Sequence, residues 1–318
     1  MTQKIVIAGG TGFIGRHLTR LLQTHNYEVI ILTTKTLPED ASGVTYVHYE
    51  PGKDPDPEVM SAISGSYSVI NLAGASIGKK WSNSYKNVLF ESRVNSTYTI
   101  VSAVNSSKEP PLSVINASAI GYYGDRGSEN LTEESPPGTD FLSRLCVGWE
   151  EEAKKLNNFI TRLITPRFGV VLGADGGAFP ELYGLAVKGR GVSFGNGDNW
   201  MSWIHIDDLC EAILFLMNKT EHFGVFNLVA PNPVRKEELQ NIIADEVKKK
   251  VSLKAPRMLI RLIGGEGAVN ALFSSQYVLP QRLQDAGFDF KHEDIRKTVK
   301  ELIEETRNSN QNHEPLKA

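Results

Sequence analysis

The chain has 318 residues, and its 34 basic and 37 acidic side chains give a formal net charge of −3. This length suits one large α/β domain with a smaller lobe, and the near-neutral charge predicts no general attraction to nucleic acid or to an anionic membrane. No apolar run reaches the ~18 residues that a membrane-spanning helix requires, and the first residues lack the pattern of a signal peptide. We therefore expect a cytoplasmic protein with neither a membrane nor a nucleic-acid partner; the sequence indicates no oligomeric state.

The first 22 residues carry the most informative pattern. Residues 4–8 form an apolar run rich in β-branched side chains, glycines follow at positions 9, 12 and 15, and residues 14–22 have the apolar spacing of a helix. Gly9 and Gly12 would let the backbone approach a pyrophosphate, and Gly15 would let the helix lie close to the strand. The helix N-terminus would offer free N–H groups to the anion. This strand, turn and helix predict a dinucleotide site.

Strands and helices alternate along the rest of the chain. Apolar runs predict strands at 28–34, 44–49, 68–74, 113–118, 159–164 and 225–229. Helical spacing is found at 84–106, 141–156, 207–217, 235–248 and 293–305. In the first of these helices, Val88, Leu89, Val94, Tyr98, Val101 and Val104 form the expected buried stripe. Residues 124–140, rich in glycine and proline, are expected to form a loop.

This alternation predicts an α/β fold, a Rossmann-type doubly wound parallel sheet with a smaller C-terminal substrate lobe. Residues 1–172 would form the NADP-binding domain, and residues 201–229 would return to it. Residues 173–200 and 230–318 would form the substrate lobe. In such sheets the ligand lies at the carboxyl ends of the strands.

The end of the second predicted strand decides the cofactor. Enzymes that prefer NAD usually place a carboxylate there, ~20 residues after the glycines, to bind the adenosine ribose. Here the residues are Thr33, Thr34 and Lys35, while Glu39 and Asp40 come later in a loop. Two hydroxyls and an ammonium suit a 2′-phosphate, so we expect NADP(H); the alternative is that Lys35 is only solvated.

Both cysteines, Cys146 and Cys210, lack the spacing of metal ligands or of a disulfide framework. We expect packed thiols and no metal site.

Five motifs occur in the order found in extended short-chain dehydrogenases/reductases: G-G-T-G-F-I-G at 9–15, N-L-A-G at 71–74, S-A-I-G-Y-Y-G at 118–124, R-F-G-V-V-L-G at 167–173 and W-I-H-I-D-D-L at 203–209. More narrowly, the chain resembles the atypical NAD-dependent epimerase/dehydratase-like family that carries a cell-division inhibitor homologue label. The narrower resemblance rests on G-Y-Y-G, F-L-x-x-L-C-x-x-W-E at 141–150 and V-L-P-Q-R-L-x-x-A-G-F at 278–288.

The resemblance implies roles for individual residues. Six would line the pyrophosphate: Gly9, Thr11, Gly12, Phe13, Ile14 and Gly15. Four would pass beneath the adenosine and its ribose: Asn71, Leu72, Ala73 and Gly74. Ser118 would lie near the nicotinamide. The alternatives are that residues 71–74 are small for packing and that Ser118 only bonds to backbone.

The resemblance fails at the usual proton-transfer pair. Short-chain dehydrogenases place a tyrosine, and a lysine four residues later, at the start of the helix after the Ser118 strand. The corresponding positions here are Leu145 and Trp149, which exchange no proton. Tyr122 or Tyr123 is then the nearest candidate donor, and a phenol gives a proton to a developing alkoxide more readily than it takes one. Both tyrosines could instead be packing residues.

Two further polar residues, His205 and Arg167, have two interpretations each. His205 could face the pocket, although we favour an architectural role for its segment, in which Asp207 caps the following helix. Arg167 could reach substrate or phosphate, or could pair with an acid at the sheet edge.

Together these features predict an NADP(H)-dependent oxidoreductase that acts on a small-molecule substrate, with Ser118, Tyr122 and Tyr123 as catalytic candidates. A nucleotide-sugar epimerase or dehydratase is the first alternative, although it normally needs the missing tyrosine and lysine. The second alternative is a non-catalytic NADP(H)-sensing binding protein.

Overall fold

The computed structural model describes residues 2–35, 43–189, 192–194, 199–249, 253–255 and 274–312. Its central sheet has the strand order β14-β8-β5-β4-β1-β2-β3, and β6 also pairs with β8. The strands are β1 (Lys4–Ala8), β2 (Glu28–Thr33), β3 (Thr45–His48), β4 (Ser68–Asn71), β5 (Ser113–Asn116), β6 (Ser118–Ala119), β8 (Arg162–Phe168) and β14 (Gly224–Leu228). Every neighbouring pair is parallel. The predicted doubly wound Rossmann-type sheet is confirmed.

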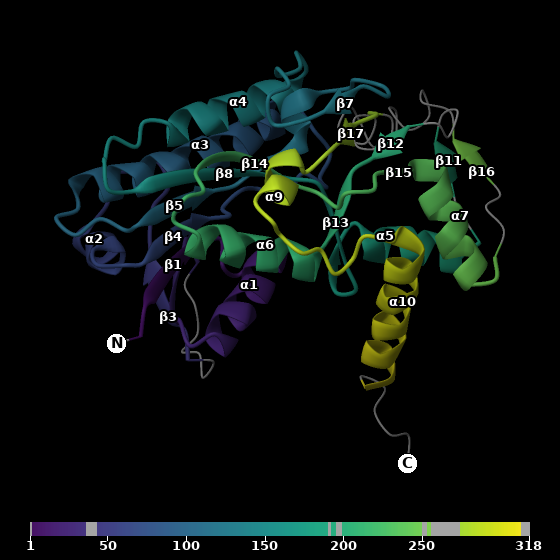
Figure 1. Cartoon of the computed structure of the whole chain (residues 1–318), viewed down its shortest axis with the longest axis horizontal. Helices are drawn as coiled ribbons and strands as arrows, with labels where there is room; N and C mark the ends of the chain where they lie inside the picture. The colour runs from purple at the N-terminus through teal and green to yellow at the C-terminus, as the bar shows by residue number, and fades with distance from the viewer. Residues whose placement is uncertain are drawn as a thin grey trace.

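Helices cover both faces of this sheet (Figure 1). One face carries α1 (Phe13–Thr24) and α6 (Ile206–Asn218), and the other carries α2 (Pro57–Ile63), α3 (Asn83–Ser106) and α4 (Phe141–Ala153). Side chains alternate along each strand, so Ile5 and Ile7 pack with α1 and α6 while Val6 and Ala8 pack with α2 and α3. Both faces of the strands are therefore apolar, as a two-sided parallel sheet requires.

Helix α3 differs from the predicted stripe. Leu89, Val101 and Val104 are buried as expected, but Val88 is 44% exposed and Tyr98 is 37% exposed. Polar residues occupy the buried face in their place: Ser96, Thr97 and Thr99. The physical reason is hydrogen bonding, because the first two of these hydroxyls bond to Asn71 and Asn116 at the strand ends. An apolar stripe alone could not reveal a polar contact between a helix and a sheet.

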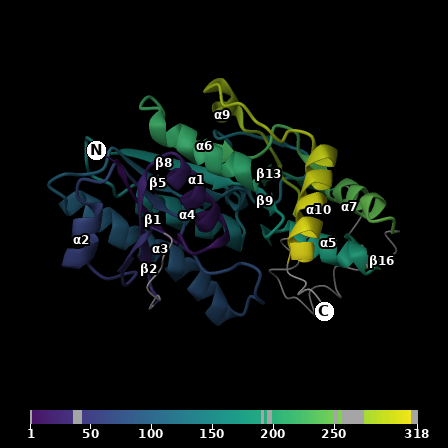
Figure 2. The same cartoon turned by 90° about the horizontal axis from the view of Figure 1, so that it is seen from below.

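A second core lies beyond one end of the sheet, where Figures 1 and 2 show α5, α7 and α10 grouped together. The elements around it are β9 (Val170–Gly173), β10 (Gly176–Gly177), α5 (Phe179–Val187), β12 (Trp200–Met201), β13 (Trp203–His205), β15 (Val234–Arg235), α7 (Lys236–Glu246) and α10 (Ile295–Asn312). Its buried side chains include Phe179, Trp203, Leu239, Ile243 and Leu302. Most of this core comes from the segments assigned to the substrate lobe, but Leu172 and Trp203 come from segments assigned to the dinucleotide-binding domain. The division at residue 172 stays a prediction.

Part of that region instead packs on the large sheet. Leu283 in α9 (Gln281–Asp285) and the following Phe290 are buried in the same core as α6 and β14. The predicted loop at 124–140 contains a short strand, β7 (Asn130–Leu131), which pairs with β17 (Tyr277–Val278). The remaining pair is β11 (Val192–Phe194) with β16 (Leu253–Ala255), and the 3₁₀ helix η1 spans Ile120–Tyr123.

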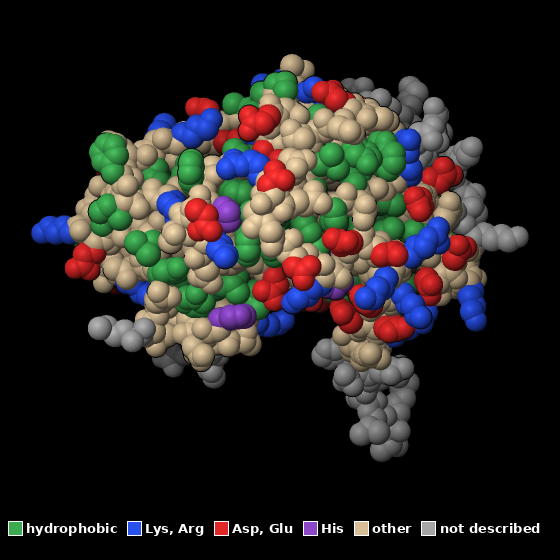
Figure 3. Space-filling view, viewed as in Figure 1, with side chains coloured by type: hydrophobic (Ala, Val, Ile, Leu, Met, Phe, Trp, Pro, Cys, Tyr) green, Lys and Arg blue, Asp and Glu red, His purple; other side chains and the backbone are tan. Residues whose placement is uncertain are grey.

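The surface agrees with the near-neutral charge. Figure 3 shows acidic and basic side chains intermingled on the face drawn. Within the described ranges, no helix has the length and apolarity needed to cross a membrane, and no group of side chains could hold a metal ion. Cys146 and Cys210 are free and buried, which confirms the expectation of packed thiols. Burial raises the pKa of the Cys146 thiol to about 12.

Candidate functional site

The carboxyl ends of β1, β4, β5 and β6 meet along one edge of the sheet. Ala8 pairs with Asn71, and Asn71 pairs with Asn116. One strand further along, Ser118 pairs with Arg167. The strand order reverses between β1 and β4, because β2 and β3 follow on one side of β1 and β4 pairs with its other side. Dinucleotides bind to such sheets at this point of reversal. The tertiary structure therefore brings three of the predicted segments, 9–15, 71–74 and 118–123, to one edge.

Glycine is required at two positions of the first turn. Gly9 has a φ of +80°, and a Cβ there would lie 2.8 Å from the carbonyl carbon of Leu72. A Cβ on Gly15 would overlap the carbonyl oxygen of Gly9, so only glycine lets α1 start this close to β1. Gly12 differs, because a Cβ there would meet only that carbonyl oxygen, at 3.2 Å, and its backbone φ is −75°.

The N-terminus of α1 is free to bind an anion. Gly12 is the N-cap residue, no side chain caps the helix, and its first turn holds no acidic residue. The backbone N–H groups of Phe13, Ile14 and Gly15 therefore point out of the first turn with no capping side chain. The ring of Phe13 packs against Gly173 and Gly176, so its part in anion binding would come from its backbone. Such an end fits the pyrophosphate of a dinucleotide.

At the end of β2, Thr33 is buried and its hydroxyl accepts a hydrogen bond from the Lys35 backbone N–H at 3.1 Å. Thr34 and Lys35 are exposed. Glu39 and Asp40 lie outside the described residues. The described part of this strand end thus offers a cation and a free hydroxyl, which fits a ribose phosphate.

Asn71 shapes its loop from within the protein, since its side chain is fully buried. Its amide Nδ2 donates to Asn116 at 2.8 Å and to Thr97 at 3.0 Å. Its Oδ1 accepts from the backbone N–H of Ala73 at 3.2 Å and from the Ser96 hydroxyl at 3.1 Å. Leu72 and Ala73 are partly buried and Gly74 is exposed, so these three residues form the surface of the loop.

Ser118 lies above a buried ion pair. Its hydroxyl donates to Glu150 Oε1 at 2.6 Å, and Glu150 accepts two parallel hydrogen bonds from Arg167, each 2.8 Å long. Burial disfavours the charged guanidinium, but the hydrogen bonds to Glu150 outweigh it and raise the pKa of Arg167. Of the two interpretations of Arg167, the structure supports pairing with an acid. Ser118 itself is only 1% exposed.

The two neighbouring tyrosines differ in environment. The Tyr123 hydroxyl donates to Asn227 Oδ1 at 2.6 Å and accepts from Arg167 Nη1 at 3.0 Å. Tyr123 is fully buried, and burial raises the pKa of its phenol to about 12. The Asn227 backbone N–H in turn donates to the buried carboxylate of Glu133 at 2.9 Å. A continuous polar chain therefore runs from Glu133 to Ser118 under the sheet edge.

Tyr122 is partly exposed, and within the described part of the chain its hydroxyl makes no hydrogen bond. Its ring lies 3.4 Å from the guanidinium carbon of Arg167 and packs in a cluster with Ala117, Ala119 and Leu145. Of the three catalytic candidates, Tyr122 alone is accessible from solvent.

The positions that would hold the missing pair are apolar and buried. Leu145 is 3% exposed and Trp149 is 6% exposed. The indole N–H of Trp149 donates to the Thr97 hydroxyl at 3.0 Å, which links α4 to α3. These positions support packing and transfer no proton.

His205 has an architectural role, but its detail differs from the prediction. Its Nδ1 accepts from the Asp207 backbone N–H at 3.2 Å, so His205 is the N-cap of α6 and Asp207 is not. Its ring stacks on His292 with centroids 3.8 Å apart. Burial, with a smaller contribution from His292, lowers the pKa of His205 to about 4.

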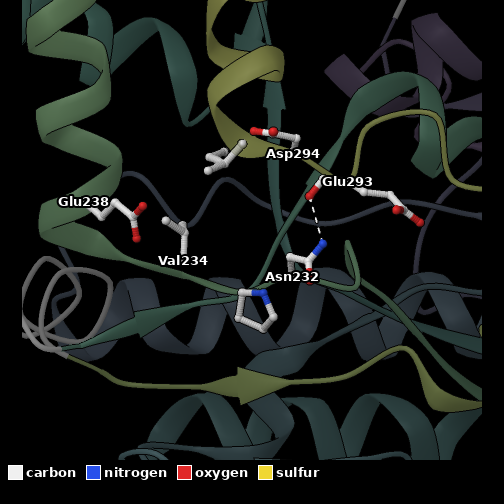
Figure 4. A pocket seen from close by; sticks show the side chains of 7 residues that line it. Asn232, Val234, Glu238, Glu293 and Asp294 are labelled. Atoms are coloured by element: carbon white, nitrogen blue, oxygen red, sulfur yellow. Dashed lines mark hydrogen bonds between the residues drawn. The ribbon is translucent and has the colours of Figure 1, made fainter.

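The two described cavities lie away from this sheet edge. One, of about 370 Å³, lies between β15, α7 and the start of α10 (Figure 4). Its lining residues are Asn232, Pro233, Val234, Glu238, Glu293, Asp294 and Ile295. The other, of about 610 Å³, has Asp54, Met60 and Ser102 in its wall. Neither contains a predicted site residue, and an acidic lining does not suit a dinucleotide phosphate.

Sequence reasoning missed Glu150, Asn227 and Glu133. Glu150 had one available signal, the acid at the end of F-L-x-x-L-C-x-x-W-E, which lies on the same helix as the two apolar replacements. Asn227 and Glu133 lie in a strand and a loop without any local motif, so only the folded chain reveals them.

The pattern that defines the NAD dependent epimerase/dehydratase family matches residues 5–228. The chain belongs to this family. A domain of unknown function, DUF1731, matches residues 255–302 of this family member. The extended short-chain dehydrogenase resemblance is thereby confirmed, and with it the nucleotide-binding fold.

The relatives of this epimerase-family chain match nearly all of it. It is 34% identical to epimerase family protein SERP0438 of Staphylococcus epidermidis, over 95% of this chain and 99% of that protein. It is 33% identical to the chloroplastic epimerase family protein SDR39U1 homologue of Arabidopsis thaliana, over 94% of this chain and 86% of that protein. Human epimerase family protein SDR39U1, solved with NADPH, matches with a TM-score of 0.86 and 27% identity, covering 95% of this chain and 99% of that one.

Proposed function

We propose that this protein binds NADP(H) and uses it to reduce a carbonyl group of a small molecule. The observation that carries the cofactor is the uncapped N-terminus of α1 at the reversal of strand order. Lys35, exposed at the end of β2, would bind the 2′-phosphate. The SDR39U1 structure solved with NADPH supports this choice.

The proposed contacts of the cofactor follow the geometry of the edge. Backbone N–H groups of Thr11, Phe13, Ile14 and Gly15 would bind the pyrophosphate, and Gly9 and Gly12 would leave room for it. Leu72, Ala73 and Gly74 would lie beneath the adenosine and ribose, on a loop that Asn71 holds in shape. Thr33 and Thr34 would flank the ribose phosphate.

For the reaction, NADPH supplies a hydride to the carbonyl carbon when it is bound. The carbonyl oxygen then needs a proton, and we assign Tyr122 as its donor because this phenol is partly exposed and free of hydrogen bonds within the described residues. Ser118 is buried and donates to Glu150, so we assign it a positioning role, in which it would hold the Glu150 carboxylate and through it Arg167 beneath Tyr122. Tyr123 would hold Arg167, and through it Glu150, in place.

The test screens aldehydes and ketones for substrate-dependent oxidation of NADPH. Any substrate found is then measured with two tyrosine variants. Tyr122→Phe should lower turnover by about 10²-fold or more, since a positioned general acid contributes 10²–10⁴-fold, while the affinity for NADPH changes little. Tyr27→Phe is the matched control, because the Tyr27 phenol lies on the surface and bonds to Asn218 far along the chain. Full turnover in Tyr122→Phe would reject Tyr122 as the donor.

A nucleotide-sugar epimerase is the second candidate. A nucleoside-diphosphate sugar epimerase of Corynebacterium glutamicum matches at 30% identity and a TM-score of 0.76, although the chain covers only 63% of that structure. Leu145 and Trp149 count against this reaction. Turnover of UDP-sugars without net NADPH oxidation would favour it over reduction. An absence of turnover with every compound, combined with a partner captured only in the presence of NADPH, would favour the sensor.

A further inference from the structure

The hydroxyl of Thr97 is buried at the centre of a hydrogen-bond network beneath the proposed dinucleotide site. Thr97 lies on α3 and is fully buried, as is Asn71 at the end of β4. Its oxygen accepts from Asn71 Nδ2 and from the indole Nε1 of Trp149, each at 3.0 Å. Its single proton has two acceptors within reach, the Arg93 carbonyl oxygen at 2.9 Å and Asn116 Oδ1 at 3.1 Å. Both lone pairs and the proton of this hydroxyl are therefore engaged.

The Asn71 side chain connects Thr97 to the loop at the sheet edge. Its Nδ2 donates to Thr97, and its Oδ1 accepts from the backbone N–H of Ala73 at 3.2 Å. Because the Ala73 N–H can only donate, the amide oxygen of Asn71 must face the loop and its Nδ2 must face Thr97. A valine at position 97 would offer no acceptor to this Nδ2 or to the Trp149 indole.

The loop held by Asn71 also touches the glycine turn after β1. Gly9 lies so close that a Cβ there would be 2.8 Å from the Leu72 carbonyl carbon and 2.9 Å from the Ala73 nitrogen. The two backbones are thus in direct contact, so a shift of the Leu72–Ala73 peptide would displace the turn assigned to the pyrophosphate or open a gap beside it. Both proposed cofactor contacts therefore depend on the orientation of the Asn71 side chain.

The network continues from Asn71 toward the end of β2. The Ser96 hydroxyl, also on α3, donates to Asn71 Oδ1 at 3.1 Å and accepts from the Tyr49 hydroxyl at 3.0 Å. Tyr49 is buried, and its backbone N–H donates to the Thr33 carbonyl oxygen at 3.0 Å. Buried hydroxyls of α3 thus link the Asn71 loop to the strand end assigned to the ribose phosphate.

We propose that Thr97 is a positioning residue for the dinucleotide, and that its buried hydroxyl holds, through Asn71, the loop that would lie beneath the adenosine. Trp149, at the position of the missing lysine, would support the same loop from inside the protein through Thr97. This inference rests on the proposed cofactor site and not on the proposed reduction. It concerns affinity, so binding measurements test it without any substrate.

The first measurement uses the cofactor-free protein and follows hydrogen exchange of the Ala73 backbone amide by NMR. Exchange is expected to be slow in the wild-type protein, because a buried oxygen accepts this N–H. Thr97→Val keeps the shape of the side chain but removes the hydroxyl, so Ala73 should exchange about tenfold faster or more. Thr97→Ser keeps the hydroxyl and should restore the slow exchange.

The second measurement is a calorimetric titration with NADPH and with adenosine 2′,5′-bisphosphate, which has no nicotinamide. Thr97→Val should weaken both ligands by the same factor, about tenfold, which corresponds to a loop in the binding conformation in about one molecule in ten. Thr97→Ser should bind both ligands as the wild-type protein does. If Thr97→Val does not fold, Trp149→Phe carries the test with a smaller loss, about threefold, because it removes one donor to Thr97 and keeps an aromatic ring.

Thr161→Val is the matched control. Thr161 is 8% exposed, and its hydroxyl donates to the Pro111 carbonyl oxygen at 2.7 Å. It directly precedes β8, at the opposite edge of the sheet from the proposed site. The same substitution there also removes a buried hydrogen bond, but it should change neither the Ala73 exchange nor the affinity for NADPH.

Losses for both ligands in Thr97→Val, with wild-type binding in Thr97→Ser and Thr161→Val, support the proposal. It is overturned if folded Thr97→Val binds both ligands as the wild-type protein does, or if Thr97→Ser or Thr161→Val loses as much affinity. A loss for NADPH alone would also overturn it, since the effect would then lie at the nicotinamide end. If the wild-type protein binds neither ligand, the proposed function fails, and the Ala73 exchange still decides whether Thr97 holds the loop.

Discussion

Glu150 on α4 and Arg167 on β8 form a two-pronged ion pair directly beneath Ser118. Both of its hydrogen bonds are 2.8 Å long, and the two side chains are 4% and 3% exposed. A pair buried this deeply holds one orientation, since both oxygens and two nitrogens are engaged. It therefore fixes the direction in which Ser118 donates and the position of the guanidinium under Tyr122.

Glu150→Gln should destabilise the protein, because it leaves the buried Arg167 charge uncompensated. The expected cost is about 3–5 kcal/mol in the free energy of unfolding, measured by urea denaturation. Glu151→Gln is the control on the next residue of the same helix. Its ion pair with Lys154 is 2.7 Å long but lies on the surface, so its loss should cost about 0–1 kcal/mol. Equal costs for the two variants would contradict the importance of the buried pair.

Gly12→Val should abolish NADPH binding and leave the protein folded. A side chain there would enter the space of the pyrophosphate, while its Cβ meets only the Gly9 carbonyl oxygen at 3.2 Å. Isothermal titration calorimetry measures the affinity, and circular dichroism checks the fold. Gly184→Ala, where a Cβ meets nothing within 4 Å, should bind NADPH as the wild-type protein does. Unchanged affinity in folded Gly12→Val would rule out the turn as the pyrophosphate site.

Lys35→Ala should weaken NADPH more than NADH, because only NADPH carries the 2′-phosphate. We expect a loss of about 1–3 kcal/mol in the binding free energy of NADPH, at the lower end because Lys35 is exposed. Competition binding with both cofactors measures the difference. Lys53→Ala, in a surface pair with Glu50, should change neither affinity. Equal losses for the two cofactors would show that Lys35 does not contact the phosphate.

Tyr123 should make the protein sensitive to alkaline pH. Its folded pKa is about 12 against an ordinary value of 10.0, so the unfolded chain loses this proton first as the pH rises. The contribution of Tyr123 to the free energy of unfolding, about 2–3 kcal/mol, is fully present below pH 10 and is lost between pH 10 and pH 12. Tyr123→Phe should be less stable at neutral pH but should lack this part of the alkaline loss. Identical alkaline profiles would disprove the assignment.

His205 should make the protein sensitive to acid. Its folded pKa of about 4 lies below the ordinary 6.5, so the unfolded chain gains a proton first as the pH falls. The stability from this group, about 3 kcal/mol, is present above pH 6.5 and is lost toward pH 4. His292 and Asp208 face it, and the raised pKa of His292, caused mainly by its bond to Asp208, offsets part of the loss.

The comparison uses His205→Asn, because asparagine can still cap α6. Urea unfolding at pH 7 and pH 5 should show a smaller acid loss in the variant than in the wild-type protein. If His205→Asn loses as much unfolding free energy between pH 7 and pH 5 as the wild-type protein does, other groups cause the acid sensitivity.

Local sequence patterns were enough to predict the Rossmann-type sheet and the glycine-rich turn after β1. Both depend on neighbours in the sequence, since alternating strands and helices set the parallel sheet, and glycine is needed where the chain turns into α1. The apolar character of Leu145 and Trp149 was likewise readable from the sequence, and both are buried. The site residues themselves remain predictions until they are tested.

Contacts between distant segments were decided only by the folded chain. Tyr122 and Tyr123 are alike in sequence, but η1 turns one phenol into the core toward Asn227 and leaves the other partly exposed. The Glu150 carboxylate meets Arg167 only because α4 lies over β8. Such polar pairings have no periodicity, because each depends on where two separate segments lie in three dimensions.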